Sequence, residues 1–453
     1  MSLRKISADI ANFLFVVYAF FVDIISVFPP YIRLGMWFLI IFLQAVSYNF
    51  VIRYEKKLAF VLVLTCCIAL INNQEIIRGN LPYMMTLKFM ITFLYFFLII
   101  FDQSSYNKIM KTVISMGLIN VIATYFFLLV PSAYAAMFNV WGYYPTGTQQ
   151  GTHGYRAALT NHYSHNGIIC IITTIALFAV LISDFQKQSK KKRRFIRYLV
   201  LFLLSLFAVV MTSKRGVLLF GVVAMMLVYS ICNIQNIARN GIKIVIVAAV
   251  IVTLLYLGYR FIPIIHNTID RFLVIGTEDD KEADSRFEFW KAAIKLFFQH
   301  PVFGIGWFGF RYYYNENLYD KSQRAERYSY MNAHNVYIQM LCESGAVGFI
   351  IYITLLIAVT VLVFRLIHRT YSMPGYPHKR QVIFGSSMHF LFVFYSLTGN
   401  CLYDMTFAFY CIALGFLLGT NNESRNYKKK LLEQKKRQNE IEMLDRSRFF
   451  VDS

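Results

Sequence analysis

Residues 197–233 read RYLVLFLLSLFAVVMTSKRGVLLFGVVAMMLVYSICN, and this stretch decides the fold class. Two apolar runs, 197–212 and 216–233, are separated by a turn of only a few residues. A helix needs about 20 apolar residues to cross the hydrocarbon core of a bilayer. Each run therefore predicts a membrane-spanning helix, with the short turn between them at one membrane surface.

Apolar runs of this kind recur along the whole chain of 453 residues, which is 57% hydrophobic and only 15% charged. Soluble domains average roughly 25% charged residues, so lipid is the expected solvent. The sequence predicts an all-α polytopic membrane protein with about 12 transmembrane helices. The predicted spans lie at 10–28, 33–51, 58–72, 83–101, 109–130, 166–183, 197–212, 216–233, 243–260, 335–364, 382–400 and 402–420.

The positive charges predict how these spans are oriented. The net charge is +21, and Lys and Arg residues that flank spans are retained on the cytoplasmic side. They are concentrated in alternate loops, at 4–5, 53–57, 187–197 and 365–380, and in a basic cytoplasmic tail, 421–453. We expect both termini of the transmembrane domain 1–420 to face the cytoplasm. One long loop with short helices, 261–333, is then extracytoplasmic. No nucleic-acid partner is expected, because the basic stretches lack stacking aromatics outside the spans.

The outward loop contains a candidate anion site. From Ser285, an N-cap type residue, the sequence SRFEFWKAAIKLFFQHP repeats apolar residues at helical spacing. Arg286 would stand in the first turn, where the partial positive charge of a helix N-terminus adds to its own. The residues expected to lie on the membrane surface are Phe289, Ala293, Leu296 and Phe297. Arg311, in the aromatic stretch that follows, is a candidate substrate contact.

Candidate catalytic and binding residues also open the tenth predicted span. His334 and Asn335 stand where this span leaves the outer surface, so His334 is placed to take a proton; the alternative is an N-cap or interfacial residue. Glu343 lies two or three turns deeper, and a carboxylate inside a span is a functional candidate by default. Its alternative is a polar bridge to a neighbouring helix.

Two further outward segments carry cations. Lys214 and Arg215 occupy the tight turn MTSKRG, where they would attract a lipid diphosphate; contact with lipid headgroups is the alternative. Arg156 lies in the loop GTHGYRAALTNHYSHNG before the sixth span. The nearby histidines do not fit one helical face and lack Cys or Asp partners, so no metal site is predicted. The histidines concerned are His153, His162 and His165.

These segments resemble the bacterial O-antigen ligase and polymerase family of membrane glycosyltransferases. The resemblance runs from roughly 150 to 350 and rests on TSKRG at 212–216, on SRFEFW followed by HPVFGIGWFGF, and on HNVYIQMLCESGAVG at 334–348. An Arg-then-Asn pattern before the sixth span matches loosely. The chain departs from the family in having Lys214 where a Ser more often precedes the Arg, which leaves the register of that turn open.

The resemblance implies inverting, metal-independent glycosyl transfer from an undecaprenyl-diphosphate-linked oligosaccharide, without a cofactor. Arg215 and Arg286 would stabilise the leaving diphosphate, and His334 would act on the acceptor hydroxyl. The residues that would bind substrate are Arg156, Lys214, Asn335, Glu343 and Arg311.

The acceptor remains open at this point. We favour a polymerase that joins repeat units of capsule, exopolysaccharide or O-antigen in the bacterial cytoplasmic membrane. Its expected partners are membrane lipids, and a flippase and chain-length regulator. A ligase-type transfer to another acceptor, a transporter or flippase of lipid-linked sugars, and a non-catalytic scaffold are the alternatives.

Overall fold

The computed structural model describes an all-helical protein. Three predicted spans, 58–72, 83–101 and 243–260, lie outside the described residues apart from isolated positions, as do parts of the predicted outward loop. No strand occurs in the described ranges, so the all-α class is confirmed there. These ranges are 3–22, 30–47, 64, 67, 70, 73–77, 103–141, 154–160, 162–185, 192–233, 253, 256, 259–261, 266, 269–270, 281–317, 331–373, 375–403 and 406–449.

The helices follow the apolar runs of the sequence. Their bounds are α1 Leu3–Val17, the π-helical turn η1 Tyr18–Val22, α2 Pro30–Ser47, α4 Gln74–Ile77, α6 Gln103–Leu129, α7 Pro131–Trp141, the 3₁₀ turn η2 Gly154–Arg156, α8 Tyr163–Phe185, α9 Lys192–Met211, α10 Arg215–Cys232, α13 Lys281–Gln299, α14 Gly309–Asn317, α15 Val336–Tyr371, α16 Lys379–Tyr395 and α17 Thr406–Phe449.

Five of the described helices are long and apolar enough to cross a membrane. They are Ser105–Leu129 within α6, Tyr163–Ser183 within α8, and the whole of α9, α10 and α15. Each coincides with a predicted span. Helices also occupy the predicted spans at 10–28, 33–51, 382–400 and 402–420. The total of about twelve stays a prediction.

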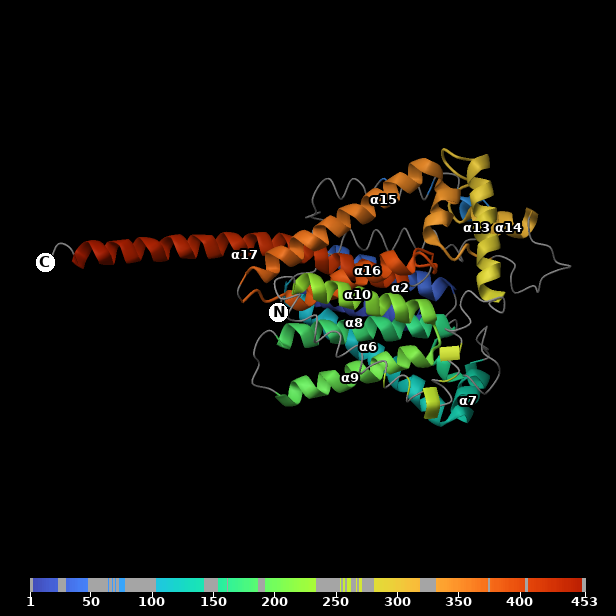
Figure 1. Cartoon of the computed structure of the whole chain (residues 1–453), viewed down its shortest axis with the longest axis horizontal. Helices are drawn as coiled ribbons and strands as arrows, with labels where there is room; N and C mark the ends of the chain where they lie inside the picture. The colour runs from blue at the N-terminus through green and yellow to red at the C-terminus, as the bar shows by residue number, and fades with distance from the viewer. Residues whose placement is uncertain are drawn as a thin grey trace.

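Helix α8 forms the centre of the bundle. Its most apolar window is 89% buried, against 22% for that of α9. Figure 1 shows α8 between α10 and α6, and α8 also packs against α9 and α16. The outer helices instead expose apolar side chains that only lipid would cover. Examples are Val200, Leu203 and Leu204 of α9 and Leu219, Val223 and Met226 of α10.

Helix α15 is interrupted at Gly345, nearer its N-terminal end. Gly345 has φ 63° and ψ −169°, so the 36 residues form two helical segments joined at this glycine. The carbonyl groups before the break and the N–H groups after it lose their helical partners. In a membrane such groups need partners from protein, and the loop after α13 supplies them, as described below.

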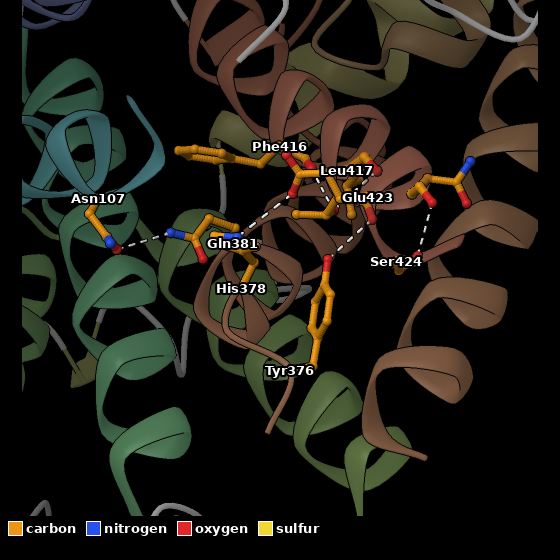
Figure 2. Close-up of polar contacts among 10 residues, drawn as sticks. Asn107, Tyr376, His378, Gln381, Phe416, Leu417, Glu423 and Ser424 are labelled. Atoms are coloured by element: carbon orange, nitrogen blue, oxygen red, sulfur yellow. Dashed lines mark hydrogen bonds and ion pairs between the residues drawn. The ribbon is translucent and has the colours of Figure 1, made fainter. Parts of the chain in front are cut away.

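Helix α17 runs from Thr406 to Phe449 across residue 420, where we placed the boundary between the transmembrane domain and the basic tail; that boundary stays a prediction. Figure 2 shows polar contacts around its middle: the Tyr376 hydroxyl donates to the carbonyl of Thr420 at 3.2 Å, and His378 Nε2 lies 3.8 Å from Glu423 Oε2. Beyond them the helix projects away from the bundle (Figure 1), and residues 432–443 are all exposed.

Candidate functional site

One end of the bundle carries the start of α8, the turn between α9 and α10, the start of α15 and the end of α16. We call it the site end. Figure 1 places α7, α13 and α14 there, and both chain termini toward the opposite end. The candidate cations of the sequence, with His334 and Asn335, belong to the elements that meet at the site end.

The turn between α9 and α10 presents two cations at this end. Ser213 takes the left-handed conformation with φ 58°, which reverses the chain and lets Arg215 begin α10. The Lys214 ammonium nitrogen lies 5.6 Å from the centroid of the Tyr163 ring at the start of α8. That distance permits a cation–π contact, so the lysine is oriented toward α8.

The same turn packs closely on α8 because α8 has a glycine there. A Cβ on Gly167 would lie 3.0 Å from Thr212 Oγ1 and 3.1 Å from Lys214 Cβ. His162 lies just before α8, and its pKa is lowered to about 4, first by burial and then by the charge of Lys214. His162 is therefore neutral at pH 7 and adds no positive charge beside the turn.

The segment after α16 links this turn to His334. A Cβ on Gly216 would lie 3.0 Å from Thr398 Oγ1, so the start of α10 touches residues 396–400. Two residues further on, Asn400 Nδ2 lies 3.2 Å from Nδ1 of His334. The N–H of Val336 also donates to the carbonyl of Ser396 at 2.8 Å. The cationic turn and the histidine thus flank one short segment.

Helix α13, which carries Arg286, packs against α15 beside His334. The rings of Phe289 and His334 are 6.4 Å apart, and Trp290 Nε1 donates to the carbonyl of Ala333 at 2.9 Å. Arg286 precedes these two residues by three and four positions, so it shares their face of the helix. The arginine consequently lies on the α13 face that meets the start of α15.

Two expectations about α13 were wrong. The helix begins at Lys281 rather than after a cap at Ser285, so Arg286 stands in the second turn and not at the N-terminus. Its apolar face also does not lie on the membrane surface. Phe289, Ala293 and Leu296 are buried against a cluster that includes Ile305, Phe310, Tyr314 and Ala333. The apolar spacing predicted the apolar face of the helix correctly, but protein rather than lipid covers that face.

The loop after α13 pairs with the break in α15. Its N–H groups at Ile305 and Gly306 donate to the carbonyls of Cys342 and Glu343, at 3.1 and 2.8 Å. In return the N–H groups of residues 346 and 347 donate to the carbonyls of residues 301 and 302. The two backbone segments approach so closely that each needs a glycine at the contact. A Cβ on Gly304 (φ 71°) would lie 2.4 Å from backbone atoms of Glu343, and one on Gly345 would lie 2.3 Å from the carbonyl oxygen of Val302.

Glu343 holds the same loop through its side chain. The carboxylate is fully buried and accepts four hydrogen bonds, from the N–H groups of Phe308 (3.0 Å) and Phe310 (3.1 Å), from Gln339 Nε2 (3.0 Å) and from the Tyr403 hydroxyl (2.7 Å). All four groups donate to its two oxygens, so the side chain is the common acceptor that joins them. The geometry is that of a polar bridge between segments, and the predicted contact of Glu343 with substrate stays a prediction.

Asn335 and Arg311 also have partners within the protein. Asn335 Oδ1 accepts from the N–H groups of Tyr337 and Ile338 at 3.0 and 3.1 Å, which makes it the N-cap of α15. Arg311 Nη2 donates to the Tyr312 hydroxyl at 2.8 Å, and its guanidinium carbon lies 4.7 Å from that ring. Their substrate-binding roles remain predictions.

Arg156 lies in a loop that α8 anchors. Asn166 Nδ2 donates to the carbonyl of Arg156 at 2.8 Å, and the N–H of Leu159 donates to Asn120 Oδ1 at 3.3 Å. Asn166 precedes Gly167, where the cationic turn packs, so Arg156 lies on the α8 side of that turn. Of the three nearby histidines, His153 is outside the described residues.

Backbone strain marks the same places. In the described part of the chain, the non-glycine residues with left-handed φ are Ala158, Ser213, Phe308 and His334. Each of these residues lies within three positions of a candidate site residue or is itself a candidate site residue. Such conformations cost about 1–3 kcal/mol and cluster at functional sites. The strain therefore supports the site end as the functional site on grounds independent of charge.

Part of the sequence matches one known protein family. Residues 200–353 match the family Wzy_C, described as O-antigen ligase. Over these residues the chain is similar to the O-antigen ligase family. The resemblance seen in the sequence is thereby confirmed, although the match begins at residue 200 and not near 150. No curated protein matches the chain.

The region that matches the O-antigen ligase family covers about one third of the chain. It contains the cationic turn, α13, the loop that pairs with α15, and the break at Gly345. Arg156 and the segment 396–403 lie outside it. That segment supplies two residues that the sequence analysis did not single out, Asn400 and Tyr403. Their partners, His334 and Glu343, are 60 residues or more away in the chain, so no local spacing could reveal them.

Proposed function

We propose that this membrane protein polymerises undecaprenyl-diphosphate-linked oligosaccharide repeat units into a surface polysaccharide. The observation that supports the proposal is that the turn with Lys214 and Arg215, the start of α15 with His334, and the α13 face that carries Arg286 belong to elements that meet at the site end. A phosphorylated lipid carrier that rises from the bilayer beside this end would meet fixed cations and a titratable base.

The proposed reaction is a single inverting displacement. The acceptor hydroxyl oxygen forms a bond to the anomeric carbon as the bond from that carbon to the diphosphate oxygen breaks. The hydroxyl proton passes to His334, which acts as the general base. Undecaprenyl diphosphate leaves with the electron pair of the broken bond, so no metal or cofactor is required by the balance.

The arginines act on the leaving group. Negative charge on the diphosphate grows as the glycosidic bond breaks, so fixed guanidinium groups stabilise the transition state more than the bound substrate. We assign this role to Arg215 and Arg286. Lys214, Arg156 and Arg311 contribute to binding of the donor or the growing glycan. Confinement of both lipid-linked partners to one membrane lowers the entropy cost of bringing them together.

The proposed orientation follows the positive charges. The site end would face the extracytoplasmic side of the bacterial cytoplasmic membrane, with both termini in the cytoplasm. The protein would then act on repeat units delivered by a flippase. A single cysteine introduced within 275–285 should react with an impermeant reagent added from outside; labelling from the cytoplasmic side alone would reverse the orientation.

The direct test uses purified protein and synthetic lipid-diphosphate repeat units. The wild-type protein should produce a ladder of longer glycans, and Arg286→Ala and His334→Ala should abolish it. His368→Ala and Arg437→Ala, at exposed positions near the opposite end, are matched controls. Normal ladders from both site variants would remove the proposed mechanism.

A second candidate has one observation in its favour, since the matched family is described as O-antigen ligase. A ligase would use the same donor chemistry but a different acceptor, such as a lipid core or a protein. The ladder experiment separates the two: a ligase given repeat units alone would form no chains longer than its donor, whereas adding its acceptor would restore transfer.

A further inference from the structure

The side chain of Asn400 contacts the ring of His334, with Asn400 Nδ2 3.2 Å from His334 Nδ1. Asn400 follows α16 and lies outside the residues that match the O-antigen ligase family. Its backbone is fixed as well, because its carbonyl accepts from the N–H of Tyr403 at 2.8 Å. Tyr403 in turn donates to Glu343. Asn400 thus approaches the histidine from a braced segment.

The backbone of His334 is held on both sides. Before it, the N–H of Ala333 donates to Gln339 Oε1 at 2.9 Å, and the carbonyl of Ala333 accepts from Trp290. After it, Asn335 caps α15. These contacts hold His334 itself at φ 53°, a left-handed conformation that a non-glycine residue keeps only when its surroundings enforce it. The backbone at His334 is therefore fixed from both sides.

An asparagine is suited to fixing the rotation of the His334 ring. A neutral imidazole has one donor and one acceptor nitrogen, and the amide of Asn400 offers a donor and an acceptor that a half-turn of the side chain exchanges. Asn400 Oδ1 is buried and has no hydrogen-bond partner among the described residues. In the structure Nδ2 faces Nδ1, and a half-turn of the amide side chain brings Oδ1 to that place, where it accepts from Nδ1–H.

We propose that Asn400 is the positioning residue of the proposed base. It holds His334 through Nδ1, so that Nε2 faces the reacting hydroxyl. This inference rests on the proposed function. During the reaction the hydroxyl proton moves to Nε2 while Nδ1–H stays bound to Asn400 Oδ1. The wrong tautomer, with the proton on Nε2, would leave no lone pair for the hydroxyl proton.

The charge of the surroundings explains why an amide suits this position better than a carboxylate. Charged residues on the described elements near His334 include Arg286 and Glu288 of α13, Lys214 and Arg215 at the start of α10, and Glu343 of α15, whose side chain is held by four donors. A neutral partner on Nδ1 adds no charge beside the ring. An aspartate would favour the imidazolium form and raise its pKa.

The experiment measures kcat, KM for the lipid-linked donor and the pH profile of the purified protein. Asn400→Ala and Asn400→Leu should lower kcat about 10–100-fold, the usual effect of losing a residue that orients a functional histidine, with KM within about twofold of wild type. Asn400→Asp keeps an acceptor for Nδ1–H, so it should retain most of kcat at its optimum. Its acidic limb should move up by about one pH unit. Asn233→Ala, which removes one side-chain hydrogen bond near the other end of α10, is the control and should behave as wild type.

Wild-type kcat in both Asn400→Ala and Asn400→Leu would overturn the inference, as would an acidic limb of Asn400→Asp that does not move. If the alanine variant does not fold, the nearly isosteric aspartate variant decides alone through its pH profile. His334→Ala separates the two proposals. Activity in that variant would remove the proposed base itself, whereas an inactive His334→Ala beside normal Asn400 variants would remove only the role of Asn400.

Discussion

Replacement of Glu343 by alanine tests whether its carboxylate holds the loop 301–310 against α15. The change leaves four donors without their acceptor, including two backbone N–H groups of the loop. A hydrogen bond to a charged group contributes about 1.5–3 kcal/mol. Burying the charge itself costs several kcal/mol, so the sum of four bonds overstates the net effect. We expect the free energy of unfolding to fall by about 3–5 kcal/mol, because each buried donor left without an acceptor costs about 1–3 kcal/mol and the loop can relax to hydrate some of the four.

Tryptophan fluorescence during thermal unfolding in detergent measures this loss. Trp307 is buried beside Tyr403, with ring centroids 5.7 Å apart, and reports on the loop directly. The expected drop in Tm is roughly 5–10 °C. Glu343→Gln keeps one acceptor oxygen and should fall between alanine and wild type. Glu440→Ala, exposed on α17, is the control. A Tm for Glu343→Ala within about 1 °C of wild type would show that the four contacts do not hold the loop.

Three other outcomes follow from the same geometry. Gly304→Ala should destabilise the protein by more than the usual 1–3 kcal/mol of left-handed strain, because its Cβ would lie 2.4 Å from backbone atoms of Glu343; a Tm equal to that of the wild type would contradict the close approach. His162 has a folded pKa of about 4, below its ordinary value of about 6.5, so the unfolded chain binds its proton first and stability is lost as pH falls from about 6.5 to about 4. His162→Asn should therefore reduce the decrease in Tm over this pH range, and an unchanged pH dependence of Tm would refute this. Arg215→Ala should lower kcat by about 10²–10³, and Lys214→Ala should mainly raise KM for the donor. Initial rates over a range of donor concentrations measure both constants. Equal effects of the two variants on kcat would contradict the separate roles of these residues.

Apolar length predicted the helices of this fold well, because span formation depends on local composition. The helices α6, α8, α9 and α10 begin and end within a few residues of the predicted spans. The break in α15 was not predicted. A glycine inside an apolar run is common, and only the pairing of Gly345 with Val302 shows that the helix stops there.

The site could be predicted in part, since charges that flank spans are visible in sequence. Lys214, Arg215 and His334 do lie at one end of the bundle. The mistaken start of α13 has a physical reason: Ser285 is a good cap type, but the four residues before it also fold as helix. The parts of the site that no spacing could indicate are the long-range ones, such as the contacts of Asn400 and Tyr403 across 60 residues or more.

The most direct test of the central claim is the amount of undecaprenyl diphosphate freed for each glycosidic bond formed, measured with purified protein and a lipid-linked oligosaccharide. The account predicts one diphosphate per bond in the wild type, and a loss of both products by about 10²–10⁴ in His334→Ala, as expected for removal of a general base. Equal product formation by His334→Ala and wild type, or glycan growth without release of the lipid diphosphate, would contradict it.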